Sequence, residues 1–163
     1  YLEMIRLKTA VLLGSVLKIG AIVAGANDKN QKAIYDFGIN LGLAFQLQDD
    51  VLDSYGDTAL GKKIGGDILE GKKTYLMVQA LSRASEQECE VLCTTHLRKD
   101  ISNEEKITII KALYDKYDVK HIAEQQIELR FERALAVLDT LSVGAERTAT
   151  LVEFARNLMG RKK

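Results

Sequence analysis

The chain of 163 residues contains no proline and no tryptophan, and only two of its residues are cysteines. Because proline is the strongest interruption of a helix, its absence favours long helices over strands and tight turns. The two cysteines, Cys89 and Cys93, are too few for a disulfide framework. They indicate a reduced chain, and we expect a cytoplasmic protein.

Excess charge and long apolar runs are also absent. The 23 basic and 23 acidic residues cancel, which gives no electrostatic reason to expect a nucleic-acid partner. The apolar stretch over residues 9–26 is interrupted by Lys18 and by glycines, so we expect no integral membrane segment. With 47% hydrophobic residues, the chain can bury the core of one domain.

The apolar periodicity predicts an all-α fold, a helical bundle. The expected helices cover residues 1–24, 29–54, 67–84, 85–97, 102–117, 119–141 and 145–159. Ser102 with Glu105 forms a capping box, and Asp67 with Glu70 resembles one. Residues 55–66 include four glycines and two lysines, which predicts a loop long enough to be functional.

Chemistry concentrates on the second expected helix. Asp49 and Asp53 are one helical turn apart, Asp50 lies three positions before Asp53, and Gln46 lies three positions before Asp49. Carboxylates at this spacing repel by on the order of 1 kcal/mol in water and by more when partly buried. A divalent cation would offset this repulsion, and magnesium suits an open cluster of carboxylates better than calcium does. The alternative is a solvated acidic face.

A segment rich in glycine and lysine follows at residues 61–74. Glycines allow the backbone to approach an anion closely, and lysine ammonium groups bind phosphate oxygens as point charges. The helix expected to begin near Asp67 would add its N-terminal dipole. Carboxylates, metal, phosphate and lysines would then alternate in charge. Without the aspartates, such a segment is usually a solvated surface.

Three stretches together are specific enough to indicate a family. They are Lys8-Thr9, the pattern FQxxDDxxD over residues 45–53, and GK at residues 61–62 followed by EGKKTY at residues 70–75. They resemble the second aspartate-rich region and the upstream Lys-Thr pair of trans-isoprenyl diphosphate synthases. The resemblance implies an all-helical, Mg2+-dependent prenyltransferase that condenses an allylic diphosphate with isopentenyl diphosphate, in an isoprenoid-synthase-type fold.

The resemblance also implies roles for individual residues. Lys8, Thr9 and Gln46 would be catalytic, with the hydroxyl and the amide supporting the forming carbocation. The allylic diphosphate would be bound by Lys8, Lys62 and Lys72. Asp49 would be the direct magnesium ligand, and its partners would be Asp50 and Asp53.

The specific motifs cover residues 5–81, whereas family members are about twice as long as this chain. We therefore expect residues 1–163 to be the C-terminal helical portion of such an enzyme, without the half that carries the first aspartate-rich motif. Apolar faces on the first two helices, including Leu12, Val16, Phe37 and Leu41, are expected to face that half. If that half is absent, these apolar faces are exposed to water. We therefore expect the chain to form a homodimer or a larger oligomer and to have no prenyltransferase activity.

Three alternatives remain at this point. The chain could be a non-catalytic helical module or partner subunit that binds metal and diphosphate. A terpene cyclase fits less well, because its second metal motif normally mixes Asn, Ser or Thr with Glu. Cys89, Cys93 and His96 lie at the spacing of a helical zinc site, but packed thiols and a surface imidazole are the favoured interpretation.

Overall fold

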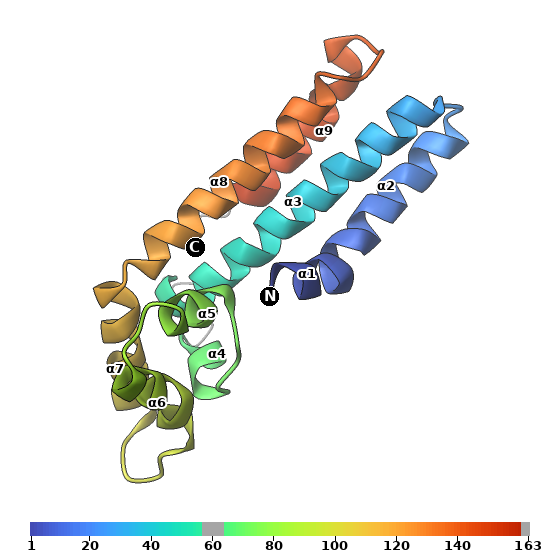
Figure 1. Cartoon of the computed structure of the whole chain (residues 1–163). Helices are drawn as coiled ribbons and strands as arrows, with labels where there is room; N and C mark the ends of the chain where they lie inside the picture. The colour runs from blue at the N-terminus through green and yellow to red at the C-terminus, as the bar shows by residue number, and fades with distance from the viewer. Residues whose placement is uncertain (57–63, 161–163) are drawn as a thin grey trace. The chain divides into compact units, whose positions relative to one another are not determined.

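The computed structural model describes residues 1–56 and 64–160, and the regular structure of these residues is helical throughout (Figure 1). The all-α class expected from the sequence is confirmed. In chain order the first elements are α1 (Leu2–Ile5), the π-helical segment η1 (Arg6–Ala10), α2 (Val11–Val23), α3 (Asp28–Tyr55) and α4 (Gly66–Leu69). They are followed by α5 (Tyr75–Leu81), α6 (Glu86–Thr94), the 3-10 segment η3 (Thr95–Leu97), α7 (Asn103–Lys116), α8 (Val119–Leu138) and α9 (Ala145–Met159).

The chain folds as two compact units. Within the described residues, we call Leu2–Gln46 together with residues 126–160 the long-helix unit, and Tyr1 together with residues 47–125 the short-helix unit. Helices α3 and α8 each contribute residues to both units. In the described residues, none of the helices combines the length and the apolar character that a membrane span needs.

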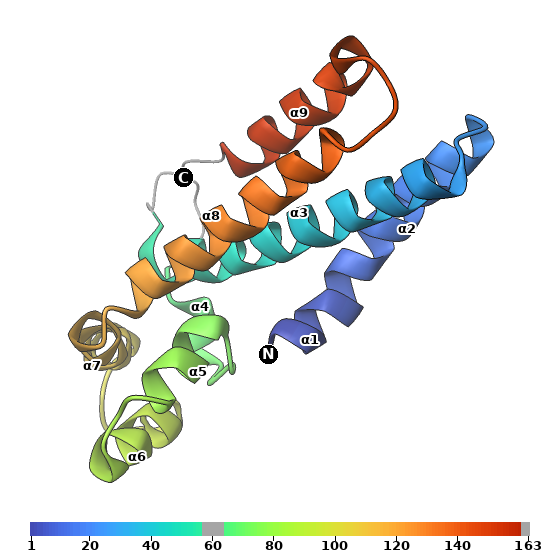
Figure 2. The ribbon, with the colours of Figure 1, turned by 45° about the horizontal axis from the view of Figure 1, so that its top comes forward.

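The core of the long-helix unit joins three helices. Its buried residues come from α3, α8 and α9, and α8 and α9 lie side by side (Figure 2). They are Phe37, Leu41, Ala134, Leu138 and Ala155. Phe37 and Leu41 are fully buried, so the expectation that they would face an absent half of the bundle is wrong. The face of α2 is different, because Leu12 is 68% exposed and Val16 is 58% exposed.

Small residues allow η1 and α2 to approach α3 closely within this unit. A Cβ atom on Gly38 would lie 2.6 Å from the Cα atom of Gly14, and a Cβ atom on Gly42 would lie 2.7 Å from the Cα atom of Ala10. Both distances are far below ordinary van der Waals contact. Glycine at positions 38 and 42 therefore sets the distance between the backbone of α3 and the backbone of the continuous segment η1–α2.

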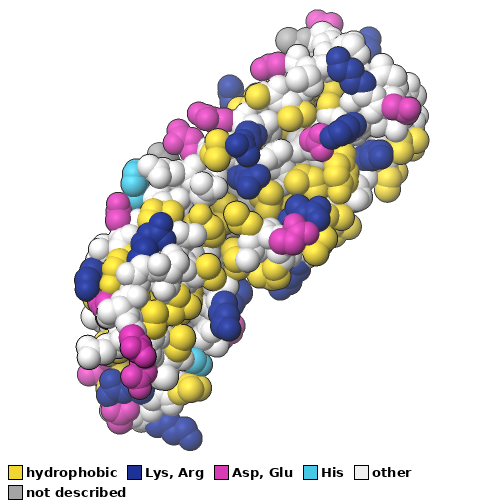
Figure 3. All heavy atoms as spheres, in the orientation of Figure 1, with side chains coloured by type: hydrophobic (Ala, Val, Ile, Leu, Met, Phe, Trp, Pro, Cys, Tyr) yellow, Lys and Arg dark blue, Asp and Glu magenta, His cyan; other side chains and the backbone are white. Residues whose placement is uncertain are grey.

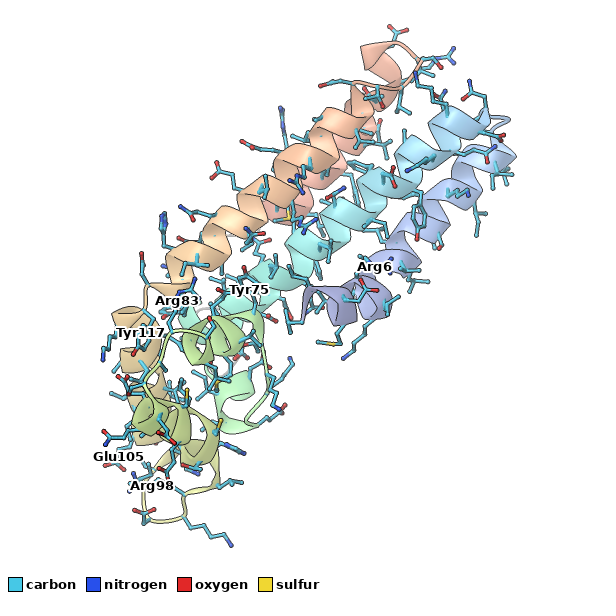
Figure 4. All side chains as sticks on the ribbon, viewed as in Figure 1. Arg6, Tyr75, Arg83, Arg98, Glu105 and Tyr117 are labelled. Atoms are coloured by element: carbon cyan, nitrogen blue, oxygen red, sulfur yellow. The ribbon has the colours of Figure 1, made fainter. Side chains whose placement is uncertain are left out.

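Helix α7 organises the short-helix unit through contacts with α4, α5, α6 and η3. Its side chains Ile110 and Tyr114 are 1% exposed. At the surface, Glu88 on α6 accepts hydrogen bonds from Lys116 Nζ and from the hydroxyl of Tyr117, both at 2.6 Å. Tyr117 is labelled in Figure 4. Burial of the apolar side chains supplies most of the stability, and the polar contacts fix α6 against the end of α7.

The single helix expected over residues 67–84 is wrong. Helix α4 ends at Leu69, and α5 begins at Tyr75. Gly71 adopts a left-handed conformation with φ +64°, which stops a right-handed helix. Thr74 caps the new helix, because its side chain accepts a hydrogen bond from Met77 N at 3.3 Å. The proposed box of Asp67 with Glu70 is not a cap, since the N-cap of α4 is Gly65 without a side-chain hydrogen bond.

Candidate functional site

The boundary between the two units separates the candidate residues into two groups. Lys8, Thr9 and Gln46 belong to the long-helix unit, and the aspartates with Lys72 belong to the short-helix unit. Each group is described within its own unit. Lys62 lies outside the described residues.

Lys8 and Thr9 lie on η1, where the helix widens to a π turn. Single π turns inside helices are frequent at functional sites. Thr9 is half-buried, and its Oγ1 donates a hydrogen bond to Gln46 Oε1 at 3.3 Å. Lys8 is exposed. The short distance between η1 and α3 at Gly42, one turn before Gln46, explains why a side chain as short as threonine reaches the amide.

The three aspartates of α3 have different surroundings. Asp49 is exposed, whereas Asp50 is 1% exposed. The Oδ2 atom of Asp50 accepts hydrogen bonds from the hydroxyl of Tyr1 and from the backbone N–H of Tyr75, the latter at 3.1 Å. Consecutive residues on a helix point about 100° apart, which explains how one carboxylate faces water while the next is buried. Burial and the hydrogen bond to Asp50 raise the pKa of the Tyr1 hydroxyl well above its ordinary value.

Asp53 connects the end of α3 to the start of α4. Its Oδ2 accepts a hydrogen bond from the backbone N–H of Asp67 at 2.9 Å, and its backbone carbonyl accepts one from Gly65 N at 2.6 Å. Burial raises the pKa of Asp53, the backbone hydrogen bond opposes this shift, and the negative charges of Asp67 and Asp49 add to it. Asp53 therefore fixes the position at which the chain enters α4.

The turn after α4 carries Lys72. Gly71 N donates to Ile68 O at 3.1 Å, and Lys72 N donates to Asp67 O at 2.9 Å. These two bonds, with Gly71 in the left-handed region, form a Schellman motif. The motif places the side chains at its two ends close together, and Lys72 Nζ bonds Asp67 Oδ1 at 2.8 Å. This hydrogen bond is the largest cause of the raised pKa of Lys72, and the negative charges of Asp50 and Asp53 raise that pKa further.

These contacts bring the turn that carries Lys72 close to the acidic end of α3, which carries Asp49, Asp50 and Asp53. Asp67 connects the two segments: its backbone N–H donates a hydrogen bond to Asp53, and its carboxylate accepts one from Lys72. No group of three or more His, Cys, Asp or Glu side chains in residues 1–56 and 64–160 is arranged to hold a metal ion. The arrangement therefore offers the exposed carboxylate of Asp49, two carboxylates held by backbone amides, and the ammonium group of Lys72, which is paired with Asp67.

Sequence reasoning missed two contributors to this arrangement. Tyr1 received no role, although its hydroxyl binds Asp50, and its ring lies 6.2 Å from the ring of Tyr75. The left-handed Gly71 was also missed, although Glu-Gly-Lys-Lys-Thr is a signal for a helix end followed by a cap. A search for C′ glycines would have found the turn.

Comparisons with known proteins agree on one family. Residues 1–115 match the family model described as polyprenyl synthetase. A geranylgeranyl pyrophosphate synthase of Geoglobus acetivorans is 37% identical over 161 residues, which are 99% of this chain and 48% of that protein. The crystal structure of geranylgeranyl pyrophosphate synthetase from Pyrococcus horikoshii is 30% identical with a TM-score of 0.88, and the match covers 99% of this chain and 48% of the other.

A third similar protein was solved with ligands. The crystal structure of geranylgeranyl pyrophosphate synthase from Corynebacterium glutamicum, complexed with isoprenyl diphosphate and magnesium, is 34% identical with a TM-score of 0.81. The match covers 96% of this chain and 44% of that one. The chain thus spans about half the length of these relatives. A family model that matches most of the chain, together with these relatives, shows that the chain belongs to the polyprenyl synthetase family, the trans-isoprenyl diphosphate synthases.

Proposed function

We propose that this chain supplies the metal- and diphosphate-binding portion of a prenyltransferase that condenses an allylic diphosphate with isopentenyl diphosphate. One observation carries the proposal. The turn that bears Lys72 is anchored to the acidic end of α3 through Asp53 and Asp67, while Asp49 stays exposed. A cationic side chain for phosphate oxygens and an unburied carboxylate for a cation therefore belong to one compact unit.

The described residues fit a magnesium ion that is held mostly by substrate and water. Mg2+ commonly uses one or two carboxylates, several waters and substrate phosphates, so a site of this kind does not need a group of three acidic side chains. Asp49 would be the direct ligand. Asp50 and Asp53, whose carboxylates already accept backbone hydrogen bonds, would act as its partners through water.

The side chains of this chain would do the rest of the binding. When bound, magnesium would neutralise negative charge on the diphosphate leaving group. Lys8, Lys62 and Lys72 would bind phosphate oxygens as point charges. Thr9 and Gln46, which bond each other at 3.3 Å, would present oxygen atoms to the allylic cation. Positioning and electrostatic stabilisation account for the chemistry without a covalent nucleophile.

Relatives support the choice of metal and substrate. The similar protein of Corynebacterium glutamicum was solved with isoprenyl diphosphate and magnesium, and relatives that match this chain are isoprenyl diphosphate synthases. Because residues 1–163 carry one aspartate-rich motif and span about half of such a protein, we propose that they are its C-terminal helical portion. Turnover would then need the portion with the first motif.

Two finer proposals concern assembly and location. The exposed apolar side chains of α2 support a homodimer, in which a second copy of this chain covers that face. The two free cysteines support a reducing, cytoplasmic location. The remaining alternative is a non-catalytic helical module or partner subunit, which would keep the face that binds metal and diphosphate but would not turn over substrate.

Titration of the 163-residue chain with inorganic pyrophosphate, with and without magnesium, tests the binding proposal. Calorimetry should show binding that depends on the metal, because Asp49 would hold a magnesium ion that offsets the negative charge of pyrophosphate. A turnover assay with an allylic diphosphate and isopentenyl diphosphate should show no product from this chain alone. Binding of pyrophosphate that is equally strong without magnesium would contradict the metal role, and product formation would contradict the need for a second portion.

A further inference from the structure

The ring of His96 packs directly against the backbone of Gly71. A Cβ atom on Gly71 would lie 2.5 Å from His96 Cδ2, 2.6 Å from Nε2 and 2.7 Å from Cγ. These distances leave no room for any side chain at position 71 while the imidazole stays in place. His96 belongs to η3, 25 positions further along the chain, so the contact joins two separate elements of the short-helix unit.

His96 is itself held in position by its surroundings. Its carbonyl oxygen accepts a hydrogen bond from Lys106 Nζ at 3.2 Å, which ties η3 to α7. The preceding residue, Thr95, is 2% exposed, and its hydroxyl donates to Val91 O at 2.7 Å. The imidazole is half-buried rather than a surface ring as expected from the sequence. The segment that presents the ring is therefore fixed on both sides.

The contact acts through packing. The Nδ1 atom of His96 is buried, and it has no hydrogen-bond partner among the described residues. A buried nitrogen without a partner costs stability, so hydrogen bonding of this atom does not explain the position of the ring. The shape of the planar ring, which covers the left-handed Gly71, does explain it.

Gly71 determines where Lys72 points. The left-handed conformation of Gly71 closes the two backbone bonds of the Schellman motif, and the motif holds Lys72 next to Asp67. An exposed lysine has many rotamers, and its backbone must be fixed for its ammonium group to occupy one region. A ring packed on Gly71 limits movement of the turn and therefore of Lys72.

We infer that His96 is a positioning residue for diphosphate binding: its ring buttresses Gly71 and so holds the turn that aims Lys72. The inference rests on the proposed role of Lys72 in binding diphosphate. It assigns His96 to the binding site through packing, in place of the zinc site that its spacing from the two cysteines raised. It also adds a steric reason for glycine at position 71, beside its backbone conformation, while the ring of His96 stays in place.

Calorimetry of the whole chain with magnesium and inorganic pyrophosphate tests the inference. Lys72→Ala should weaken binding about tenfold, as expected for the loss of a charge-assisted contact. His96→Ala should weaken it about threefold to fivefold, because the lysine remains but its turn is released. His96→Phe should stay within about twofold of the parent, since a planar ring still covers Gly71. The exposed His121 on α8 supplies the control His121→Ala, which should bind as the parent does.

A double variant separates positioning from a general structural effect. If His96 acts through Lys72, then His96→Ala should weaken binding no further in a Lys72→Ala background, because residues that act through one contact are not additive. Additive losses of affinity in the double variant would overturn the inference about His96 but not the proposed role of Lys72. The same holds if His96→Phe binds as weakly as His96→Ala while both variants retain the parent's circular dichroism spectrum. Unchanged binding in Lys72→Ala would remove the proposed role of that lysine and the inference with it.

Discussion

The hydroxyl of Thr9 donates a hydrogen bond to the amide oxygen of Gln46 at 3.3 Å, although the two residues are 37 positions apart. The bond depends on the close approach of the two helix backbones at Gly42, whose Cβ position lies 2.7 Å from Ala10 Cα. Two residues expected to support one carbocation are thus brought together by a glycine that performs no chemistry.

Substitution of that glycine should separate the helices. In Gly42→Ala the added methyl group overlaps Ala10, and we expect overpacking to cost about 1–3 kcal/mol of the free energy of unfolding. The matched control is Gly20→Ala, where nothing lies within 4 Å of the new Cβ atom. This control should stabilise the chain by up to about 1 kcal/mol through helix propensity. Urea denaturation measures both, and equal effects of the two substitutions would contradict the close-packing account.

Local signals in the sequence predicted most of the helices, although they missed the break between α4 and α5. The expected capping box of Ser102 with Glu105 is present with both reciprocal hydrogen bonds. Ser85, which was expected to open a helix, forms a second box with Glu88. Capping depends on residues three positions apart, so no knowledge of tertiary structure is needed. The helix expected over residues 29–54 from its apolar periodicity is observed as Asp28–Tyr55.

Features that depend on distant residues were not predictable. The π turn at Lys8 and Thr9 has no sequence signature of its own. The hydrogen bonds of Tyr1 and Tyr75 to Asp50 join segments 49 and 25 positions apart. Helix geometry points the side chains of residues 49 and 50 in different directions, but the segments that cover Asp50 lie far from it in the sequence.

Lys8 should affect diphosphate binding and leave stability unchanged. Its side chain is exposed on η1, so Lys8→Ala removes a charge without opening a cavity. In an enzyme that also contains the portion proposed to carry the first motif, we expect a raised Michaelis constant for the allylic diphosphate or a lower turnover number. The thermal midpoint should stay close to that of the parent. The control is Lys18→Ala, at an exposed residue of α2. Normal kinetics together with a large loss of stability in Lys8→Ala would indicate a structural role for Lys8.

Glu88 should make stability depend on pH in the acidic range. Hydrogen bonds from Lys116, Tyr117 and Ser85 lower the pKa of its carboxyl from 4.5 to about 2 in the folded chain. A folded pKa below the unfolded one means that the stabilisation is present above pH 4.5 and is lost as the pH falls toward 2. Glu88→Gln should therefore lower the thermal midpoint at about pH 6 and have a smaller effect at about pH 2.5.

The control for this experiment is Glu90→Gln, on the same helix and exposed. It should leave the pH dependence of the thermal midpoint as in the parent. If Glu88→Gln lowered the midpoint equally at both pH values, the stabilisation would not come from the ionised carboxylate.

The exposed apolar face of α2 predicts self-association. Leu12, Val16 and Ile19 are 68%, 58% and 59% exposed, and they follow one another at helical spacing. Figure 3 shows hydrophobic side chains gathered over α2. Leu12→Lys with Val16→Lys should convert a dimer into a monomer in light scattering, because a charge at the centre of an apolar interface is costly. Leu97→Lys, at a similarly exposed residue of η3, should not, and a monomeric parent chain would exclude this interface.

The most direct measurement for the whole account is the affinity of Asp49→Asn for magnesium and pyrophosphate. Asp49 is the exposed member of the three aspartates, and loss of its charge should weaken binding in calorimetry at least about tenfold, or about 1.4 kcal/mol. Asp139→Asn, at an exposed aspartate on the loop after α8, should bind as the parent does. Binding by Asp49→Asn as tight as that of the parent would contradict the assignment of this helix as the metal and diphosphate site.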